Sequence, residues 1–129
     1  MNVFDASALL AFLQGEEGSD RVETALIDGG ICGTANWSET AQKIRSHGRD
    51  WDLARAVLLS YGLQIEPVNL QDAEHAAKLW AEHAAELWRA GTGLSLGDRL
   101  CLALGARKDA DVWTADQQWG TRGKIRQIR

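Results

Sequence analysis

The sequence predicts an α/β domain with three layers, in which a central, mainly parallel sheet is flanked by helices. Short β-like runs alternate with helical stretches along the whole chain, and parallel strands need such helical connections between them. The 129 residues are 45% hydrophobic and 25% charged, which is typical of a globular protein. We therefore expect a single domain that spans residues 1–129.

Glycines and a capping residue delimit the elements of the first half of the chain. Gly15 ends the first predicted helix, the Gly29-Gly30 pair ends the second and Gly48 ends the third, because glycine favours helix C-termini. Asp50 is a good N-cap for a fourth helix. We expect strands at residues 3–5 and 31–34, and helices at residues 6–14, 16–27, 36–47 and 50–61.

Side-chain periodicity predicts the second half. Residues 63–68 alternate with period two, and Pro67 places this strand near an edge because its nitrogen cannot donate to a ladder. Apolar residues recur at helical spacing over residues 70–89, and residues 91–93 (Gly-Thr-Gly) end that helix. Ser95 then caps a helix that is apolar on nearly all sides and is expected to be central. Strands at residues 111–114 and 124–128 complete the sheet.

Charge and cysteine usage narrow the class of protein. The net charge is −4 and the isoelectric point is about 5.3, so the chain lacks the basic excess of a sequence-blind nucleic-acid binder. The N-terminal residues lack a signal peptide's basic region, and the apolar runs are too short to span a membrane. Cys32 and Cys101 fit no metal spacing. They could form one disulfide, but a chain of this size does not need one, so we expect two buried thiols in a reducing compartment. We expect a cytoplasmic protein.

Four acidic residues stand out by their positions. Asp5 ends the first strand, Glu39 opens a helix after the second, Asp98 lies in the first turn of the central helix and Asp116 follows the fourth strand. Chain topology can bring all four to the carboxyl edge of the sheet, where ligand sites of parallel sheets lie. Arg99 is the only cation adjacent to any of them. Hard oxygen ligands favour Mg²⁺, with Mn²⁺ as a substitute.

Each acid taken singly also has a structural explanation. Asp98 and Glu39 complement helix dipoles, and Asp116 caps the turn that follows it. Asp5 is the exception, because we expect no local structural role for a carboxylate at the mouth of a buried strand. A structural explanation of all four requires four coincidences at one end of one sheet.

Four blocks of sequence carry a resemblance to PIN-domain proteins. Residues 4–10 (Phe-Asp-Ala-Ser-Ala-Leu-Leu) are similar to the opening strand–turn–helix of that family, and residues 36–39 (Asn-Trp-Ser-Glu) match the place of its helix-borne glutamate. Residues 94–103 resemble its Ser-x-x-Asp helix, and residues 113–116 its strand-end Thr-x-Asp. The ordered set covers essentially the whole chain and points to the VapC toxins of toxin–antitoxin pairs. The resemblance implies a PIN-type fold and a metal-dependent endoribonuclease.

The resemblance also implies roles for individual residues. Asp5 and Asp98 match the positions that hold the metal, and Glu39 and Asp116 complete the acidic catalytic pocket. The matching small hydroxyl residues that support the pocket are Ser7 and Thr114. Gln118 stands where many relatives carry a further acid, which weakens the case for a second firmly bound metal.

The resemblance further implies partners. A cognate antitoxin, similar to VapB, is expected to insert a basic residue into the acidic pocket. RNA is the expected substrate, and a homodimer is expected. Trp80 and Trp88 are candidate anchors for a partner, although core packing explains them as well.

Other interpretations remain open. An inactive PIN fold that serves as a binding module is the alternative function. A phosphoacceptor role for Asp5 is weaker, because the haloacid dehalogenase pattern wants an acid where this chain has Ser7. Two interpretations account equally well for a group of four cations near the C-terminus. The cations contact the RNA backbone, or they form the solvated face of an edge strand. The group consists of Arg122, Lys124, Arg126 and Arg129.

Overall fold

The computed structural model describes residues 1–90 and 93–129, and the side chains of residues 1–82 and 93–129. Over this range the strands are β1 (Asn2–Phe4), β2 (Gly30–Gly33), β3 (Gln64–Glu66), β4 (Asp111–Thr114) and β5 (Ile125–Gln127). The helices are α1 (Ala6–Leu13), α2 (Ser19–Asp28), α3 (Thr34–Ser46), α4 (Trp51–Ser60), α5 (Leu70–Ala90) and α6 (Leu96–Lys108), with a 3-10 turn η1 at Gln117–Trp119.

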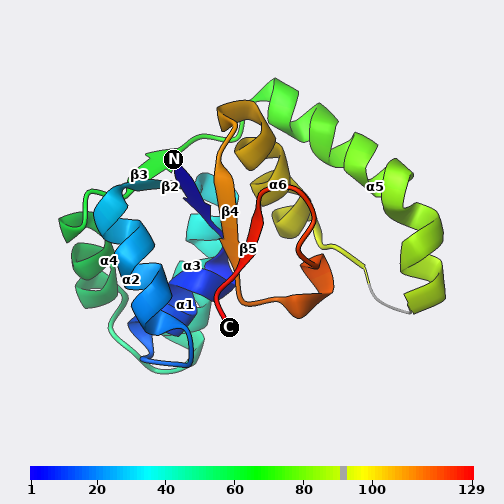
Figure 1. The fold of residues 1–129 in the computed structure, drawn as a ribbon. Helices are drawn as coiled ribbons and strands as arrows, with labels where there is room; N and C mark the ends of the chain where they lie inside the picture. The colour runs from blue at the N-terminus through cyan, green and yellow to red at the C-terminus, as the bar shows by residue number, and fades with distance from the viewer. Residues whose placement is uncertain (91–92) are drawn as a thin grey trace.

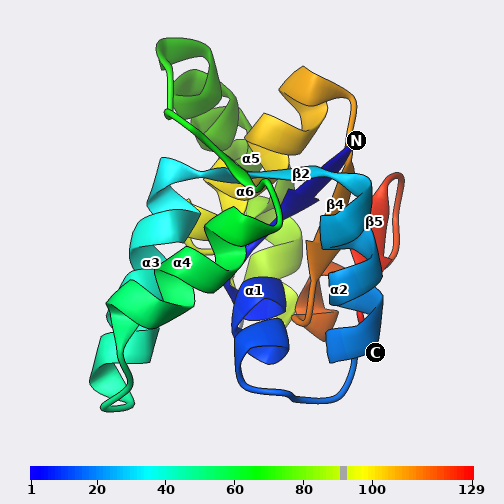
Figure 2. The same cartoon turned by 90° about the vertical axis from the view of Figure 1, so that its left-hand side faces the viewer.

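The strands form one sheet in the order β3-β2-β1-β4-β5, and every neighbouring pair is parallel. Helices cover both faces of this sheet, with α1 and α2 on one side and α5 and α6 on the other (Figures 1 and 2). Side-chain alternation along β1 gives each face its core. Phe4 packs with Leu9 and Leu26 beneath α1 and α2, whereas Val3 packs with Leu104 of α6.

The strand order reverses at β1. The chain moves from β1 through β2 to β3 in one direction, then crosses back through α5 and α6 to β4 on the other side of β1. Right-handed crossovers that travel in opposite directions leave their helices on opposite faces, as observed. Such a reversal opens a crevice outside the carboxyl ends of the two strands concerned. The carboxyl ends of β1 and β4 therefore mark the place where a ligand site is expected.

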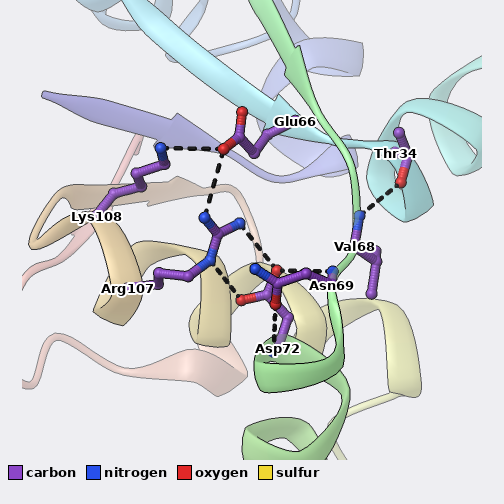
Figure 3. A network of polar contacts seen from close by, with 7 residues as sticks. All are labelled: Thr34, Glu66, Val68, Asn69, Asp72, Arg107 and Lys108. Carbon is purple, nitrogen blue, oxygen red and sulfur yellow. Dashed lines mark hydrogen bonds and ion pairs between the residues drawn. The ribbon is translucent and has the colours of Figure 1, made fainter.

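A polar network fastens the start of α5 to the end of α6 (Figure 3). Arg107 donates from Nε to Asp72 Oδ1 at 2.8 Å and from Nη2 to Asp72 Oδ2 at 3.0 Å. Glu66, at the end of β3, forms ion pairs with Arg107 at 3.4 Å and with Lys108 at 3.0 Å. Asp72 is only 3% exposed, so an unpaired charge there would be costly. The bidentate contact with Arg107 supplies the counter-charge. The network holds α6 in register against the sheet.

The predicted elements are all present, with shifted ends. The second helix begins at Ser19 rather than residue 16, because Gly18 takes a left-handed conformation with φ of 93°. Strand β3 lies at an edge of the sheet, as Pro67 predicts, and Ser95 caps the central helix α6. The turn expected after Asp116 is the 3-10 turn η1. Gly91 and Thr92, in the predicted helix break, lie outside the described residues.

Two further expectations concern the chemistry of the chain. Cys32 and Cys101 are both free and buried, as predicted. Within the described part of the chain, no helix combines the length and the hydropathy that crossing a membrane requires.

Candidate active site

Asp5 follows the last residue of β1 and is fixed by contacts from three directions. It caps α1, because the amide of Ala8 donates to Asp5 Oδ1 at 2.8 Å. Ser7 Oγ lies 2.8 Å from each carboxylate oxygen, and the hydroxyl of Thr114 donates to Oδ2 at 2.6 Å. The expectation that Asp5 has no local structural role is therefore wrong: the residue is the N-cap of α1 as well as a candidate site residue.

The end of β4 is joined to the same cluster. The register of β1 and β4 pairs Phe4 with Trp113, so Thr114 stands opposite Asp5. The hydroxyl of Thr114 accepts the amide of Asp116 at 3.0 Å, and Ser7 Oγ accepts the amide of Ala115 at 2.9 Å. The two small hydroxyl residues therefore bind the Asp5 carboxylate to the turn that carries Asp116.

Glu39 is positioned by α3 and by the start of α6. Asn36, which is 1% exposed, donates from Nδ2 to Glu39 Oε1 at 2.9 Å and to the carbonyl of Gly97 at 3.1 Å. Gly97 leaves room for the glutamate, because an added Cβ would lie 2.7 Å from both of its carboxylate oxygens. Asn36 and Gly97 are site residues that the sequence reasoning missed.

Asp98 has a structural role and a free oxygen. Ser95 and Asp98 form a capping box, in which the amide of Ser95 donates to Asp98 Oδ2 at 3.0 Å and the amide of Asp98 donates to Ser95 Oγ at 3.1 Å. No hydrogen bond to Oδ1 of Asp98 is found among the described residues. Asp116 likewise caps η1 by accepting the amide of Gln118 at 2.9 Å. The cap predicted at Asp116 is confirmed, and Asp98 lies in the first turn of α6 as predicted. The dipole role expected for Glu39 is wrong, because α3 begins at Thr34 and its first turn holds no acid.

The four acids act on one another electrostatically. Burial raises the pKa of Asp5 from 3.8 to about 6, despite its hydrogen bonds, and the charge of Asp98 adds to the increase. Burial and the charge of Asp98 also raise the pKa of Glu39. Burial raises the pKa of Asp98, with a further contribution from the charge of Asp116. Glu39, Asp5 and Asp116 therefore all lie within electrostatic range of Asp98.

Among the described residues, no cationic side chain pairs with this cluster. None of the ion pairs among the described residues involves the four acids. Arg99, the cation adjacent in sequence to Asp98, donates from Nη1 to the carbonyl of Ala76 on α5 at 2.9 Å. It therefore fastens α6 to α5 through that carbonyl.

The donor set suits a hard divalent cation in kind and charge. It consists of carboxylate oxygens. Burial, and to a lesser degree the neighbouring acids, raises the pKa of three of them, an effect that a bound cation would oppose. No group of three His, Cys, Asp or Glu side chains within the described residues is arranged to hold a metal ion. The donor set therefore fits a hard cation in its chemistry but is not preassembled as a metal site within these residues.

Three of the four C-terminal cations have intramolecular partners. Lys124 pairs with Asp109 at 2.7 Å and Arg126 with Asp111 at 3.3 Å, while Arg129 donates to the carbonyl of Glu17 at 2.9 Å. The side chain of Arg122 has no hydrogen-bond or ion-pair partner among the described residues. Arg122 is therefore the member of this group that remains available to a ligand.

The candidate partner anchors differ in what the structure describes. Trp80 on α5 is 55% exposed, which leaves it available to a partner. The side chain of Trp88 lies outside the described residues.

Comparisons with known proteins agree with this geometry. A family model described as PIN domain matches residues 3–124, whereas no curated protein matches the chain. The fold resembles a toxin–antitoxin complex chain from Klebsiella pneumoniae, with a TM-score of 0.77, 16% identity, and coverage of 100% of this chain and 98% of the other. It also resembles VapC20 of Mycobacterium tuberculosis, a Sarcin-Ricin loop cleaving toxin, with a TM-score of 0.75, 16% identity and 97% coverage of both chains. DNA-bound VapBC from Salmonella typhimurium gives a TM-score of 0.65 at 15% identity, covering 97% of this chain and 94% of the other.

Proposed function

The chain belongs to the PIN domain family, and on this basis we propose that it is a Mg²⁺-dependent endoribonuclease that acts as the toxin of a toxin–antitoxin pair. The observation that carries the proposal is the group Asp5, Glu39, Asp98 and Asp116 at the carboxyl ends of β1 and β4. Their charges act on one another, and none of them has an ion-pair partner in the part of the chain that the structure describes. The fold neighbours include a ribonucleolytic toxin and toxin–antitoxin complexes.

Asp5 and Asp98 would hold the cation, and Glu39 and Asp116 would complete the pocket. A bound Mg²⁺ would polarise the phosphodiester and lower the pKa of a water molecule. Ser7 and Thr114 keep the Asp5 carboxylate turned toward the pocket. Asp98 keeps Oδ1 for a ligand while Oδ2 caps α6. Glu39, whose pKa is raised by burial and by the charge of Asp98, would accept a proton from the attacking water.

Cleavage of RNA by the purified protein tests the proposal. Wild type should cut single-stranded RNA in Mg²⁺ and not in EDTA, and Asp5→Asn and Asp98→Asn should reduce cleavage to background. Asp20→Asn, an exposed acid on α2, is the control that should retain wild-type activity. Thermal unfolding in rising Mg²⁺ gives an independent measure, because a cation that binds only the folded state raises Tm. An Asp5→Asn protein that cuts RNA at the wild-type rate contradicts the assignment.

The same variants distinguish the alternative function. An inactive binding module would cut no RNA and would show no Mg²⁺-dependent rise of Tm. The absence of a metal-ready group of three acids within the described residues is the observation that favours this alternative. A rise of Tm in wild type that is lost in Asp5→Asn would exclude it.

We further propose that the partner is an antitoxin that places an Arg or Lys side chain among the four acids. Arg is the better candidate, since its planar guanidinium can engage two carboxylates at once. Such a segment would compete with Mg²⁺, so its inhibition should weaken as Mg²⁺ rises. Inhibition that is independent of Mg²⁺, and equal for a peptide whose cation is changed to Ala, would place the block outside the pocket. Sedimentation of the purified chain tests the proposed homodimer, for which Trp80 is a candidate contact.

A further inference from the structure

A second feature of the molecule is a mostly apolar cavity of about 600 Å³ between α5, α6, β4 and the segment from η1 to β5. The side chains that make its apolar wall are Leu79, Leu94, Leu102, Val112, Trp119 and Ile125. A volume of this size is typical of sites that hold a small molecule or a single nucleotide unit. The cavity has no role in the helix caps or in the cluster of four acids described above.

The cavity adjoins the acidic site. Asp98, Leu102 and Ala106 follow one another at four-residue steps, so they lie along one face of α6, and the last two line the cavity. Trp119, which is 7% exposed, also lines it. The indole Nε1–H of Trp119 lies near enough to Asp98 to lower the pKa of that carboxyl, although the contact does not meet hydrogen-bond geometry. One aromatic side chain therefore borders both the acids and the cavity.

Cationic groups line the same cavity on the side of the C-terminal segment. Arg122, which has no partner among the described residues, and Lys124, which is held by Asp109, both contribute to the lining. The cavity therefore combines an apolar wall, an aromatic ring and an available guanidinium, and it adjoins the acidic pocket. An apolar ligand alone would leave the guanidinium without a counter-charge, whereas a nucleotide carries both an apolar base and an anionic phosphate.

We infer that this cavity receives one unstacked base of a single-stranded RNA next to the phosphodiester that the acidic site cleaves, and that Arg122 contacts a neighbouring phosphate. The inference rests on the proposed ribonuclease function. Single-stranded RNA is recognised through bases that are splayed out and stacked on aromatic side chains, and backbone phosphates pair with Arg. The substrate class is therefore single-stranded or looped RNA, with the base in the cavity as a determinant of the cleavage position.

Two variants test the inference without changing the acids. Ala106→Phe fills the cavity from an exposed helical position, and Arg122→Gln removes the cation. Ala73→Phe, at an exposed position of α5 that does not line the cavity, and Arg55→Gln, at an exposed position of α4, are the matched controls. Thermal unfolding establishes that all four variants fold.

The probe is a short single-stranded RNA that carries one 2-aminopurine, moved along the sequence in a series of oligonucleotides. In wild type, one position should show a fluorescence change on binding, and the same oligonucleotides should be cut at a fixed distance from that position. Ala106→Phe should abolish the change and weaken binding about tenfold, and Arg122→Gln should weaken binding and flatten its salt dependence. Both controls should behave as wild type.

The outcomes separate this inference from the proposed function. Cleavage and binding that are unaltered in Ala106→Phe would overturn the cavity while leaving the ribonuclease intact. A change in oligomeric state or in antitoxin binding in Ala106→Phe, with RNA binding unaltered, would assign the cavity to a protein partner and also overturn the inference. Wild type that neither binds nor cuts RNA would overturn both.

Discussion

Gly97 and Glu39 lie so close together that a methyl group on Gly97 would stand 2.7 Å from both carboxylate oxygens of Glu39. The two residues come from different helices, α6 and α3, and Asn36 connects them by hydrogen bonds to each. The absence of a side chain at position 97 therefore helps to define where a site carboxylate rests.

Gly97→Ala should reduce RNA cleavage while leaving the fold intact. The new methyl group displaces only the flexible end of Glu39, and alanine favours the helix. A displacement of about 1 Å at a catalytic group lowers rates on the order of 100-fold. Gly105→Ala is the contrasting variant at another glycine of α6, because its Cβ would meet Val112 in the core, so it should lose stability. Cleavage rates and thermal unfolding of both variants check this, and unchanged cleavage in Gly97→Ala contradicts it.

Asn36→Ala should move the acidic limb of the pH–rate profile to higher pH. The hydrogen bond from Asn36 opposes the effects of burial and Asp98 on the pKa of Glu39, so its loss raises that pKa further. The half-buried carbonyl of Gly97 also loses the donor from Asn36, at a cost of about 1 kcal/mol in the free energy of unfolding. Thr40→Val is the control, since Thr40 donates only to the carbonyl of Asn36. If both variants lose stability and neither shifts the acidic limb of the pH–rate profile, the role of Asn36 is structural only.

The metal-free protein should lose stability as pH rises from about 4 to 6. The folded Asp5 has a pKa of about 6 against 3.8 when unfolded, so the folded state binds more protons in this window and its free energy of unfolding falls with pH. The full effect of this shift is roughly 3 kcal/mol. Asp5→Asn should flatten the profile and equal or exceed wild type in stability at pH 7. Denaturant unfolding in EDTA at several pH values measures this, with Asp20→Asn as the control, and parallel profiles for wild type and Asp5→Asn exclude the explanation.

Asp72→Asn should destabilise the protein by about 3 kcal/mol, because it leaves the guanidinium of Arg107 without its bidentate partner. The pKa of Asp72 is lowered, since Arg107 and the amide of Asn69 outweigh burial, so this contribution is present at neutral pH and is lost below about pH 4. Asp109→Asn removes the exposed pair with Lys124 and should change stability little. Equal unfolding curves for the two variants would show that the network in Figure 3 is not a stabilising one.

Most of the fold could be predicted because its signals are local. Gly15, Asp50 and Ser95 lie at the ends of helices, and period-two alternation identified β3. The four acids could be predicted as a group because each stands at the end or start of an element, and parallel strands bring such positions to one edge. The N-cap at Asp5 could also have been predicted, since aspartate before an apolar helix is a common N-cap. It was missed because Asp5 was assigned to the end of a strand.

The remaining features depend on tertiary contacts between distant segments. Asn36 and Gly97 are 61 positions apart in the sequence, and no local pattern at either position predicts their hydrogen bond. The partners of Lys124 and Arg126 depend on where β5 and the end of α6 lie relative to each other, which periodicity does not report. Arg99 lies next to Asp98 in sequence, yet its guanidinium binds α5, because successive helical residues point in different directions.

The hydrogen bond between Thr114 and Asp5 joins residues 109 positions apart, and this separation has a consequence during translation. A ribosome that adds about 5–20 residues per second needs roughly 5–20 s to travel from one to the other. Throughout that interval the nascent chain has β1 without β4, so the acids are not yet gathered. If the chain is the proposed ribonuclease, its own messenger RNA is protected from it until synthesis has passed β4. An antitoxin made from a neighbouring reading frame would have the same interval in which to accumulate.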